Sequence, residues 1–162
     1  YRDEEQEPQT VAPGDIKRIL NAAIETPKKT DLEISTSIKG FTKDSRVPSI
    51  AIRFLVMPLV RNSMESLANN APGHPNISVS IEYIKIEKSL TIKVSDNGSG
   101  WSDLSQVRES VKLVLPYSTK GPHRGFGLKH LARMVSRLGG IVQFDRVADG
   151  GATVEVRIPA QF

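Results

Sequence analysis

The chain has 162 residues, a formal net charge of +4 at pH 7 and no cysteine. Its length supports one domain, and a content of 38% hydrophobic and 25% charged residues is typical of a globular protein rather than a disordered or fibrous one. The absence of cysteine excludes disulfides, cysteine nucleophiles and thiolate metal sites, and no apolar run is long enough to span a membrane.

The apolar pattern predicts the following elements. Residues 1–13 hold two prolines and four acidic residues, which predicts a linker or disordered arm ahead of a domain at 14–162. In the first half we expect a helix from Asp15 until Pro27, a strand Leu32–Ile38, a polar connection Gly40–Pro48 and a helix from about Ser49 to Ala68. A hairpin of Ile77–Tyr83 and Leu90–Val94 should follow. The chain should end with a helix from about Gly127 to Leu138, which stops at Gly139-Gly140, and a strand pair of Ile141–Asp145 and Ala152–Ile158. Pro58 should remove one backbone hydrogen bond within the second helix and bend it. Together these predict an α+β fold, a two-layer sandwich with helices on one face of a mixed, mostly antiparallel sheet.

Positive charge is concentrated late in the chain. The segment Tyr1–Glu7 is acidic, which leaves about +7 on the rest. Seven basic residues between positions 108 and 137 are offset by Glu109 alone: Arg108, Lys112, Lys120, Arg124, Lys129, Arg133 and Arg137. An anionic partner is expected, and because aromatic residues make up only 6% of the chain, a phosphate-bearing small molecule is favoured over nucleic acid. A solvated helix face is an equal alternative for the last three.

Asn62 is the first candidate ligand. It stands among apolar residues in the helical stretch Leu59–Leu67. An amide oxygen is a hard, neutral ligand that Mg²⁺ accepts beside phosphate oxygens. The alternative is an ordinary asparagine on a helix surface.

Asp96 is the second candidate, at the end of a strand and followed by Gly98 and Gly100. A carboxylate in this place can accept a hydrogen bond from an exocyclic amine such as that of adenine, while the glycines let the backbone approach a ligand. Asp-Asn-Gly is also a common turn sequence, so an ordinary turn is the alternative.

The third candidate is the loop from Tyr117 to Leu128, which leads into the last predicted helix. Backbone N–H groups at Gly125 and Gly127 would form an anion site at the helix N-terminus, and the side chains of residues 118–120, Ser-Thr-Lys, add donors. The loop is neither a Walker A loop nor a Rossmann fingerprint. A flexible glycine loop is the alternative.

The order of these motifs resembles the ATP-binding fold shared by gyrase, the Hsp90 chaperone, histidine kinases and MutL, over about residues 15–160. Within that superfamily the chain looks most like the catalytic domain of sensor histidine kinases. The four matching motifs are Leu59–Ser63 for the N box, Asp96–Gly100 for the G1 box, Pro116–Lys120 for the F box and Gly125–Leu128 for the G2 box. A match of four motifs in order is specific, and it implies the Bergerat-type sandwich.

The resemblance implies that the cofactors are ATP and Mg²⁺. It gives Asn62 and Lys120 catalytic roles, Asn62 the metal, Asp96 the adenine amine, and residues 101–124 the role of a lid over ATP. Thr153 is expected to reach a water near the adenine. The implied nucleotide-binding residues are Asn62, Asp96, Gly98, Gly100, Tyr117, Ser118, Thr119, Lys120, Arg124, Gly125, Phe126, Gly127, Leu128 and Thr153.

Three positions depart from the family pattern. Pro58 stands four residues before Asn62, where the ATPase branch carries a glutamate base, which tells against a hydrolase like MutL or gyrase. His123 replaces the first glycine of the G2 pattern. Ala152 takes the place of the usual threonine after the late glycine, so the adenine contact is assigned to Thr153.

The expected function is transfer of the ATP γ-phosphoryl group to a histidine on a separate domain in two-component signalling. No acceptor motif surrounds His74, His123 or His130, so the acceptor domain and a response regulator are expected partners. Neither nucleic acid nor membrane contact is expected of this fragment. The missing initiating methionine suggests a piece of a longer protein. The resemblance implies that the full-length protein is a homodimer, that this domain is cytoplasmic, and that the parent protein can be anchored in a membrane. A nucleotide-binding switch module without efficient transfer and a protein serine kinase like the anti-sigma factors remain alternatives.

Overall fold

The computed structural model describes residues 10–24, 32–42, 45–69, 73–98, 125–146 and 151–160. The elements in chain order are β1 (Thr10–Val11), α1 (Pro13–Ile24), β2 (Glu33–Lys39), β3 (Val47–Pro48), α2 (Ser49–Ala51), the π-helical η1 (Ile52–Val56), α3 (Met57–Asn69), β4 (Asn76–Ile84), β5 (Ser89–Asp96), α5 (Gly125–Arg137), β6 (Ile141–Arg146) and β7 (Ala152–Pro159). Every helix and strand that the apolar pattern predicts is present.

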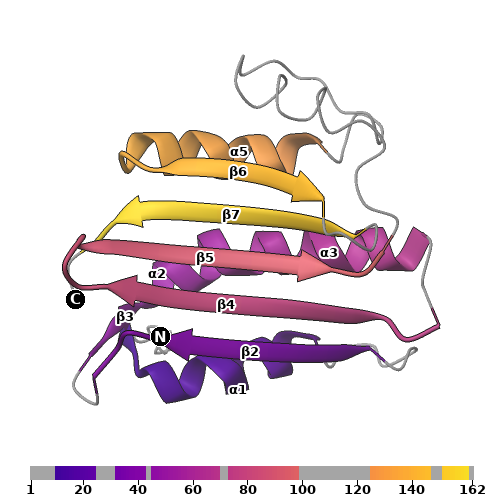
Figure 1. The fold of residues 1–162 in the computed structure, drawn as a ribbon, viewed down its shortest axis with the longest axis horizontal. Helices are drawn as coiled ribbons and strands as arrows, with labels where there is room; N and C mark the ends of the chain where they lie inside the picture. The colour runs from indigo at the N-terminus through magenta and orange to yellow at the C-terminus, as the bar shows by residue number, and fades with distance from the viewer. Residues whose placement is uncertain are drawn as a thin grey trace, which may run out of the picture.

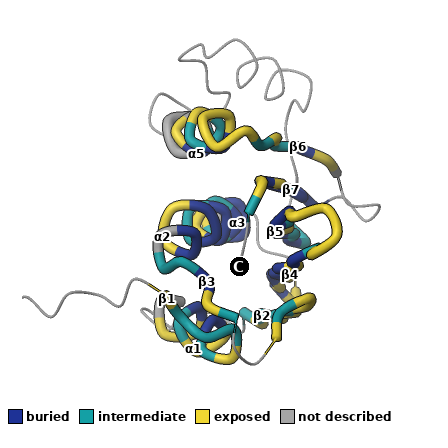
Figure 2. The backbone as a smooth tube through the Cα atoms, turned by 90° about the vertical axis from the view of Figure 1, so that its left-hand side faces the viewer, coloured by how far each residue is buried: buried dark blue, intermediate teal, exposed yellow. Residues whose placement is uncertain are grey.

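Five strands form one sheet in the order β2-β4-β5-β7-β6 (Figure 1). β2 runs parallel to β4, and the other three pairings are antiparallel. α1, α3 and α5 lie on the same side of this sheet, against β2, against β4 and β5, and against β6 and β7 respectively (Figure 2). The predicted two-layer α+β sandwich is confirmed.

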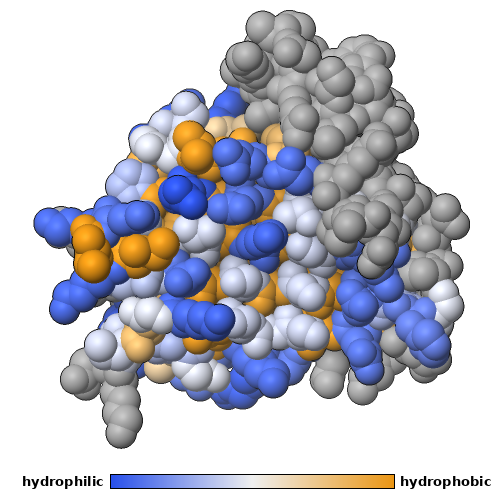
Figure 3. Space-filling model, in the orientation of Figure 1, coloured by the Kyte–Doolittle hydropathy of each residue, from blue (hydrophilic) through white to orange (hydrophobic). Residues whose placement is uncertain are grey.

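Side-chain alternation separates the two faces of the sheet. On β4 the buried residues Ile77, Val79 and Ile81 point toward the helices, where Leu59 and Val60 of α3 are also buried. The opposite face, seen in Figure 3, carries mostly polar side chains over β4 and β5 (white and blue). The hydrophobic core therefore lies between the sheet and the helices.

Pro58 affects the long helical segment in a specific way. Residues 49–69 are helical throughout, but the five residues Ile52–Val56 are π-helical, and the Met57 N–H donates to the Ile52 carbonyl five residues back. Because proline has no N–H to continue the α-helical ladder, a wider turn just before it is a common accommodation. The expected disturbance at Pro58 takes the form of this π-turn.

Two short strands fall where the sequence predicts none. Thr10–Val11 pairs with Val47–Pro48 in a second, two-stranded sheet, so the last residues of the predicted arm and of the predicted polar connection are ordered by pairing with each other. Residues 1–9 lie outside the described part. No helix among the described residues is long and apolar enough to cross a membrane.

The end of α5 matches the sequence prediction. Gly139 has a φ of +78°, and the Gly140 N–H donates to the Val135 carbonyl at 2.8 Å. This left-handed glycine with a bond across the last turn is a Schellman-type helix stop. It returns the chain from α5 directly into β6.

Candidate nucleotide-binding site

Asp96 is a buried carboxylate at the end of β5, with only 4% of its surface exposed. It lies two residues after the buried Val94, so alternation directs it to the helical side of the sheet. Its Oδ1 accepts the backbone N–H of Gly98 at 3.0 Å. A carboxylate has about four lone-pair positions, so this bond fixes the group and leaves capacity for a ligand donor.

Gly98 lies in a tight space between the strand end and α3. A Cβ atom on Gly98 would lie 3.0 Å from the Ser66 Oγ, 3.1 Å from the Asp96 Oδ1 and 3.4 Å from the Leu67 Cδ2. The first two distances are shorter than most Cβ contacts, so a side chain at this position would crowd Ser66 and Asp96. Gly100, the second predicted glycine, lies outside the described residues.

Asn97 holds the same turn in place through two hydrogen bonds that sequence reasoning did not find. Its Oδ1 accepts the Asn76 N–H at 2.8 Å, and its Nδ2 donates to the His74 carbonyl at 2.7 Å. The side chain thereby connects the start of β4 to the turn that follows Asp96. The sequence signalled only an Asp-Asn-Gly turn, because the partners lie more than 20 positions away.

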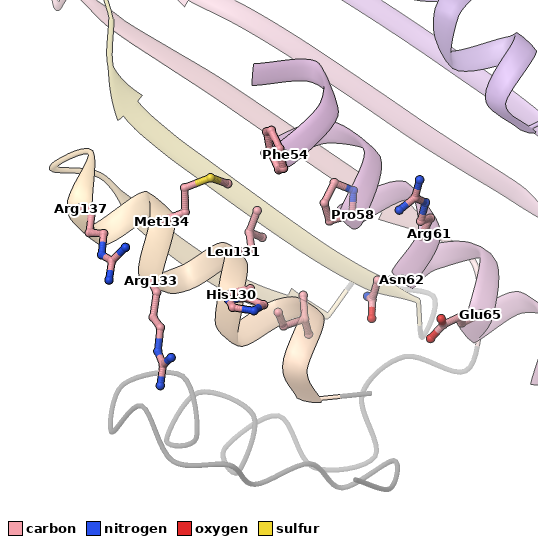
Figure 4. A pocket seen from close by; sticks show the side chains of 11 residues that line it. Phe54, Pro58, Arg61, Asn62, Glu65, His130, Leu131, Arg133, Met134 and Arg137 are labelled. Atoms are coloured by element: carbon pink, nitrogen blue, oxygen red, sulfur yellow. The ribbon is translucent and has the colours of Figure 1, made fainter. Parts of the chain in front are cut away.

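Asn62 lines a cavity of about 640 Å³ between η1–α3 and α5 (Figure 4). Its side chain is partly buried, and Glu65, one helical turn further on, lines the same cavity. The cavity is lined by Phe54, Pro58, Arg61, Asn62, Glu65, Leu128, His130, Leu131, Arg133, Met134 and Arg137. Asn62 is thus a cavity-lining residue rather than a freely exposed one.

The third motif forms the beginning of α5. Gly125, Phe126 and Gly127 are its first three residues, and Leu128 is a partly buried wall of the cavity. The first N–H groups of a helix have no partner within it, and the helix dipole favours an anion at that end. Leu128, the fourth residue of α5, and Asn62 therefore line the same cavity.

Positive charge surrounds this cavity. Arg61, Arg133 and Arg137 line it with exposed side chains, as does His130, and Glu65 is the acidic residue among the lining set. Two of these arginines belong to the late basic residues that the sequence associates with an anionic partner. Such a charge balance favours a phosphate-bearing ligand.

The described residues contain no cluster of three or more His, Cys, Asp or Glu that could hold a metal ion by itself. A single neutral amide at Asn62 does fit Mg²⁺, because this ion usually binds proteins through one or two side chains and takes its remaining ligands from phosphates and water. The residues present therefore suit a metal that arrives with a nucleotide.

Thr153 does not join this group. It lies directly opposite Ser95 on β5, and the two hydroxyl oxygens are 2.9 Å apart. Ser95 and Asp96 are consecutive strand residues and point to opposite faces, so Thr153 is on the far side of the sheet from Asp96. This geometry does not support the predicted contact of Thr153 with a water near the adenine, since a shift of one residue along a strand reverses the face.

The remaining predicted residues precede α5 in the chain. Gly100, Tyr117, Ser118, Thr119, Lys120 and Arg124, with the whole predicted lid 101–124, lie outside the described residues. The structure therefore brings Asp96 and Gly98 together at the strand end, and Asn62 and Leu128 together at the cavity.

Known proteins resemble this chain in sequence. A model of the histidine kinase-, DNA gyrase B- and HSP90-like ATPase family matches residues 48–161. The sensor protein CitS of Halalkalibacterium halodurans is 33% identical over 130 residues, which are 80% of this chain and 23% of that protein. The chain thus spans less than a quarter of this relative's length.

Solved structures show the same fold. The catalytic domain of histidine kinase ThkA superposes with a TM-score of 0.64 at 19% identity, covering 95% of this chain and 97% of that one. Full-length ShkA in complex with AMPPNP gives a TM-score of 0.67 at 15% identity, covering 94% of this chain and 31% of that one. The mycobacterial sensor histidine kinase MprB gives 0.62 at 18% identity, covering 94% and 97%.

Proposed function

The chain belongs to the family of histidine kinase-, DNA gyrase B- and HSP90-like ATPases, and we propose that it is the ATP-binding catalytic domain of a sensor histidine kinase. In this proposal it binds ATP together with Mg²⁺ and transfers the γ-phosphoryl group to a histidine on a separate domain. The relative CitS, a sensor protein, supports this choice within the family.

The observation that carries the proposal is the buried carboxylate of Asp96. A buried charge is costly unless it is hydrogen-bonded, and here the Gly98 N–H orients it toward the helical side of the sheet. Asp96 accepts the exocyclic amine of adenine in this proposal. Guanine presents a carbonyl oxygen at the same ring position, which a carboxylate repels, so adenine is selected.

The phosphates extend from Asp96 toward the cavity between α3 and α5. Asn62 supplies an amide oxygen to Mg²⁺, and bound Mg²⁺ neutralises part of the phosphate charge. The N–H groups at the start of α5 donate to phosphate oxygens. Ser118, Thr119, Lys120 and Arg124 complete the phosphate contacts in this proposal, as the resemblance implies.

The reaction itself requires little covalent chemistry from this chain. A histidine ring nitrogen of the acceptor domain attacks the γ-phosphorus, the bond from that phosphorus to the bridging oxygen breaks, and ADP leaves. Catalysis then depends on positioning and charge stabilisation. Pro58, which lines the cavity one turn before Asn62, has no group that could accept a proton from water, which favours transfer over hydrolysis.

The longer protein is also part of the proposal. We place this domain in the cytoplasm of a homodimeric kinase, with an acceptor histidine domain on the same polypeptide and a response regulator as the next phosphoryl acceptor. CitS, of which the chain covers 23%, is consistent with a much longer parent protein.

A phosphotransfer assay tests the proposal. The chain is mixed with ATP labelled at the γ-phosphate, Mg²⁺ and a histidine-bearing dimerisation domain, and a matched domain with its histidine changed to glutamine serves as control. We expect label on the first domain only, and this label is lost in acid because phosphohistidine is acid-labile. Binding of ATP without any transfer would instead indicate a switch module, and acid-stable label would indicate a serine kinase.

A further inference from the structure

An unpartnered hydroxyl lies beside Asp96. Ser66 of α3 is only 4% exposed, and its Oγ has no hydrogen-bond partner within the described part of the chain. A buried polar group without a partner costs about 1–3 kcal/mol. Such a group in a native fold calls for an explanation, and a ligand is one.

The position of this hydroxyl is defined by Gly98. The Ser66 Oγ lies 3.0 Å, and the Asp96 Oδ1 3.1 Å, from the point that a Cβ on Gly98 would occupy. Two oxygens from different elements, α3 and β5, therefore border the same corner. A side chain at residue 98 would crowd both oxygens, so glycine leaves them uncovered on this side.

The two oxygens differ in what they can bind. A carboxylate only accepts hydrogen bonds, whereas a serine hydroxyl also donates one. In adenine the exocyclic amine is a donor, and the ring nitrogens on either side of it, N1 and N7, are acceptors. A carboxylate with a hydroxyl donor next to it complements this pattern of one amine and one neighbouring ring nitrogen.

The following inference rests on the proposed function. We propose that Ser66 is a second residue that recognises the base, and that its hydroxyl donates a hydrogen bond to a ring nitrogen adjacent to the adenine amine. Neither of the first two residues of β7 can supply this donor. Ala152 has no hydroxyl, and the Thr153 hydroxyl is paired with Ser95 on the other face of the sheet. The contact is direct, rather than a structural water held between Ser66 and Asp96.

Binding of base analogues tests this assignment. ATP, 1-deaza-ATP and 7-deaza-ATP, which replace N1 and N7 respectively by carbon, are titrated into the wild type and Ser66→Ala by calorimetry with Mg²⁺. We expect the wild type to bind one of the two analogues about three- to tenfold more weakly than ATP. Ser66→Ala should bind ATP and that same analogue equally, and should bind ATP about three- to tenfold more weakly than the wild type does.

Thr36→Val is the matched control, because Thr36 Oγ1 is also buried without a hydrogen-bond partner, on the distant edge strand β2. This variant should keep the wild-type affinities, and thermal unfolding checks that both variants fold. Unchanged ATP affinity in Ser66→Ala, or discrimination against the analogue that persists in it, would overturn the role of Ser66 and leave the proposed function standing. A wild type that does not bind ATP would overturn both.

Discussion

Gly151 and Asp96 are in such close contact that a Cβ atom on Gly151 would lie 1.8 Å from the Asp96 carbonyl oxygen. The residue before β7 thus packs against the backbone of the residue that ends β5. Space, and not backbone conformation, requires glycine here, because its φ is outside the left-handed region. This contact fixes the position from which the Asp96 carboxylate reaches the candidate site.

Gly151→Ala should therefore impair both stability and binding. The added methyl group forces the strand ends apart, so we expect the free energy of unfolding to fall by about 1–3 kcal/mol and ATP affinity to fall with it. Urea denaturation and ATP titration measure the two effects. Gly14→Ala is the control, since nothing lies within 4 Å of a Cβ at Gly14 of α1, and it should be neutral or stabilise by up to about 1 kcal/mol. Equal stability of the two variants would contradict the account.

Asn97→Ala should loosen the turn that carries Gly98. It removes the two hydrogen bonds to the Asn76 N–H and the His74 carbonyl, which predicts a loss of about 1–3 kcal/mol in the free energy of unfolding. Weaker ATP binding should accompany it, because Gly98 orients the Asp96 carboxylate. Asn76→Ala is the matched control. The Asn76 side chain is exposed, and its removal keeps the backbone N–H that donates to the Asn97 Oδ1. If both variants melt at the same temperature, the two hydrogen bonds of the Asn97 side chain do not stabilise the turn.

Asn62→Ala tests the metal assignment. In the proposal Asn62 supplies one amide oxygen and the nucleotide phosphates supply further ligands, so Mg²⁺ should bind together with nucleotide. In the wild type, ATP affinity should be higher with Mg²⁺ than with EDTA. In Asn62→Ala the affinity in Mg²⁺ should fall to the value measured in EDTA, while the value in EDTA stays unchanged. A variant that retains the full effect of Mg²⁺ would exclude Asn62 as the ligand.

The sequence predicted those parts of the fold that depend on local periodicity. Ile77, Val79 and Ile81 alternate along β4, and their burial followed from that alternation. The parallel pairing of β2 with β4 was not predictable in this way, since a strand's own pattern does not specify its neighbour. Thr10–Val11 and Val47–Pro48 are too short to show any period, and only their mutual pairing makes them strands.

A local motif could indicate some residues of the candidate site, but it could not indicate those that long-range geometry brings together. Asp96 and Asn62 were found from residue type and spacing. The face on which Thr153 lies was not predictable, because its register with Ser95 is set by tertiary structure. The role of Ser66 had no signal in the sequence, since a serine within an amphipathic helix is unremarkable until its burial beside Gly98 is known.

The most direct test of the central claim is a calorimetric titration of ATP with Mg²⁺ into the wild type and Asp96→Asn. Asparagine keeps an oxygen that can accept the Gly98 N–H, so the fold should persist, but its amide group opposes the adenine amine. We predict that ATP affinity falls at least about tenfold, as the loss of a hydrogen bond to a charged group implies. Purine riboside triphosphate, which has no amine, should bind both proteins alike. Wild-type affinity of Asp96→Asn for ATP would contradict the account.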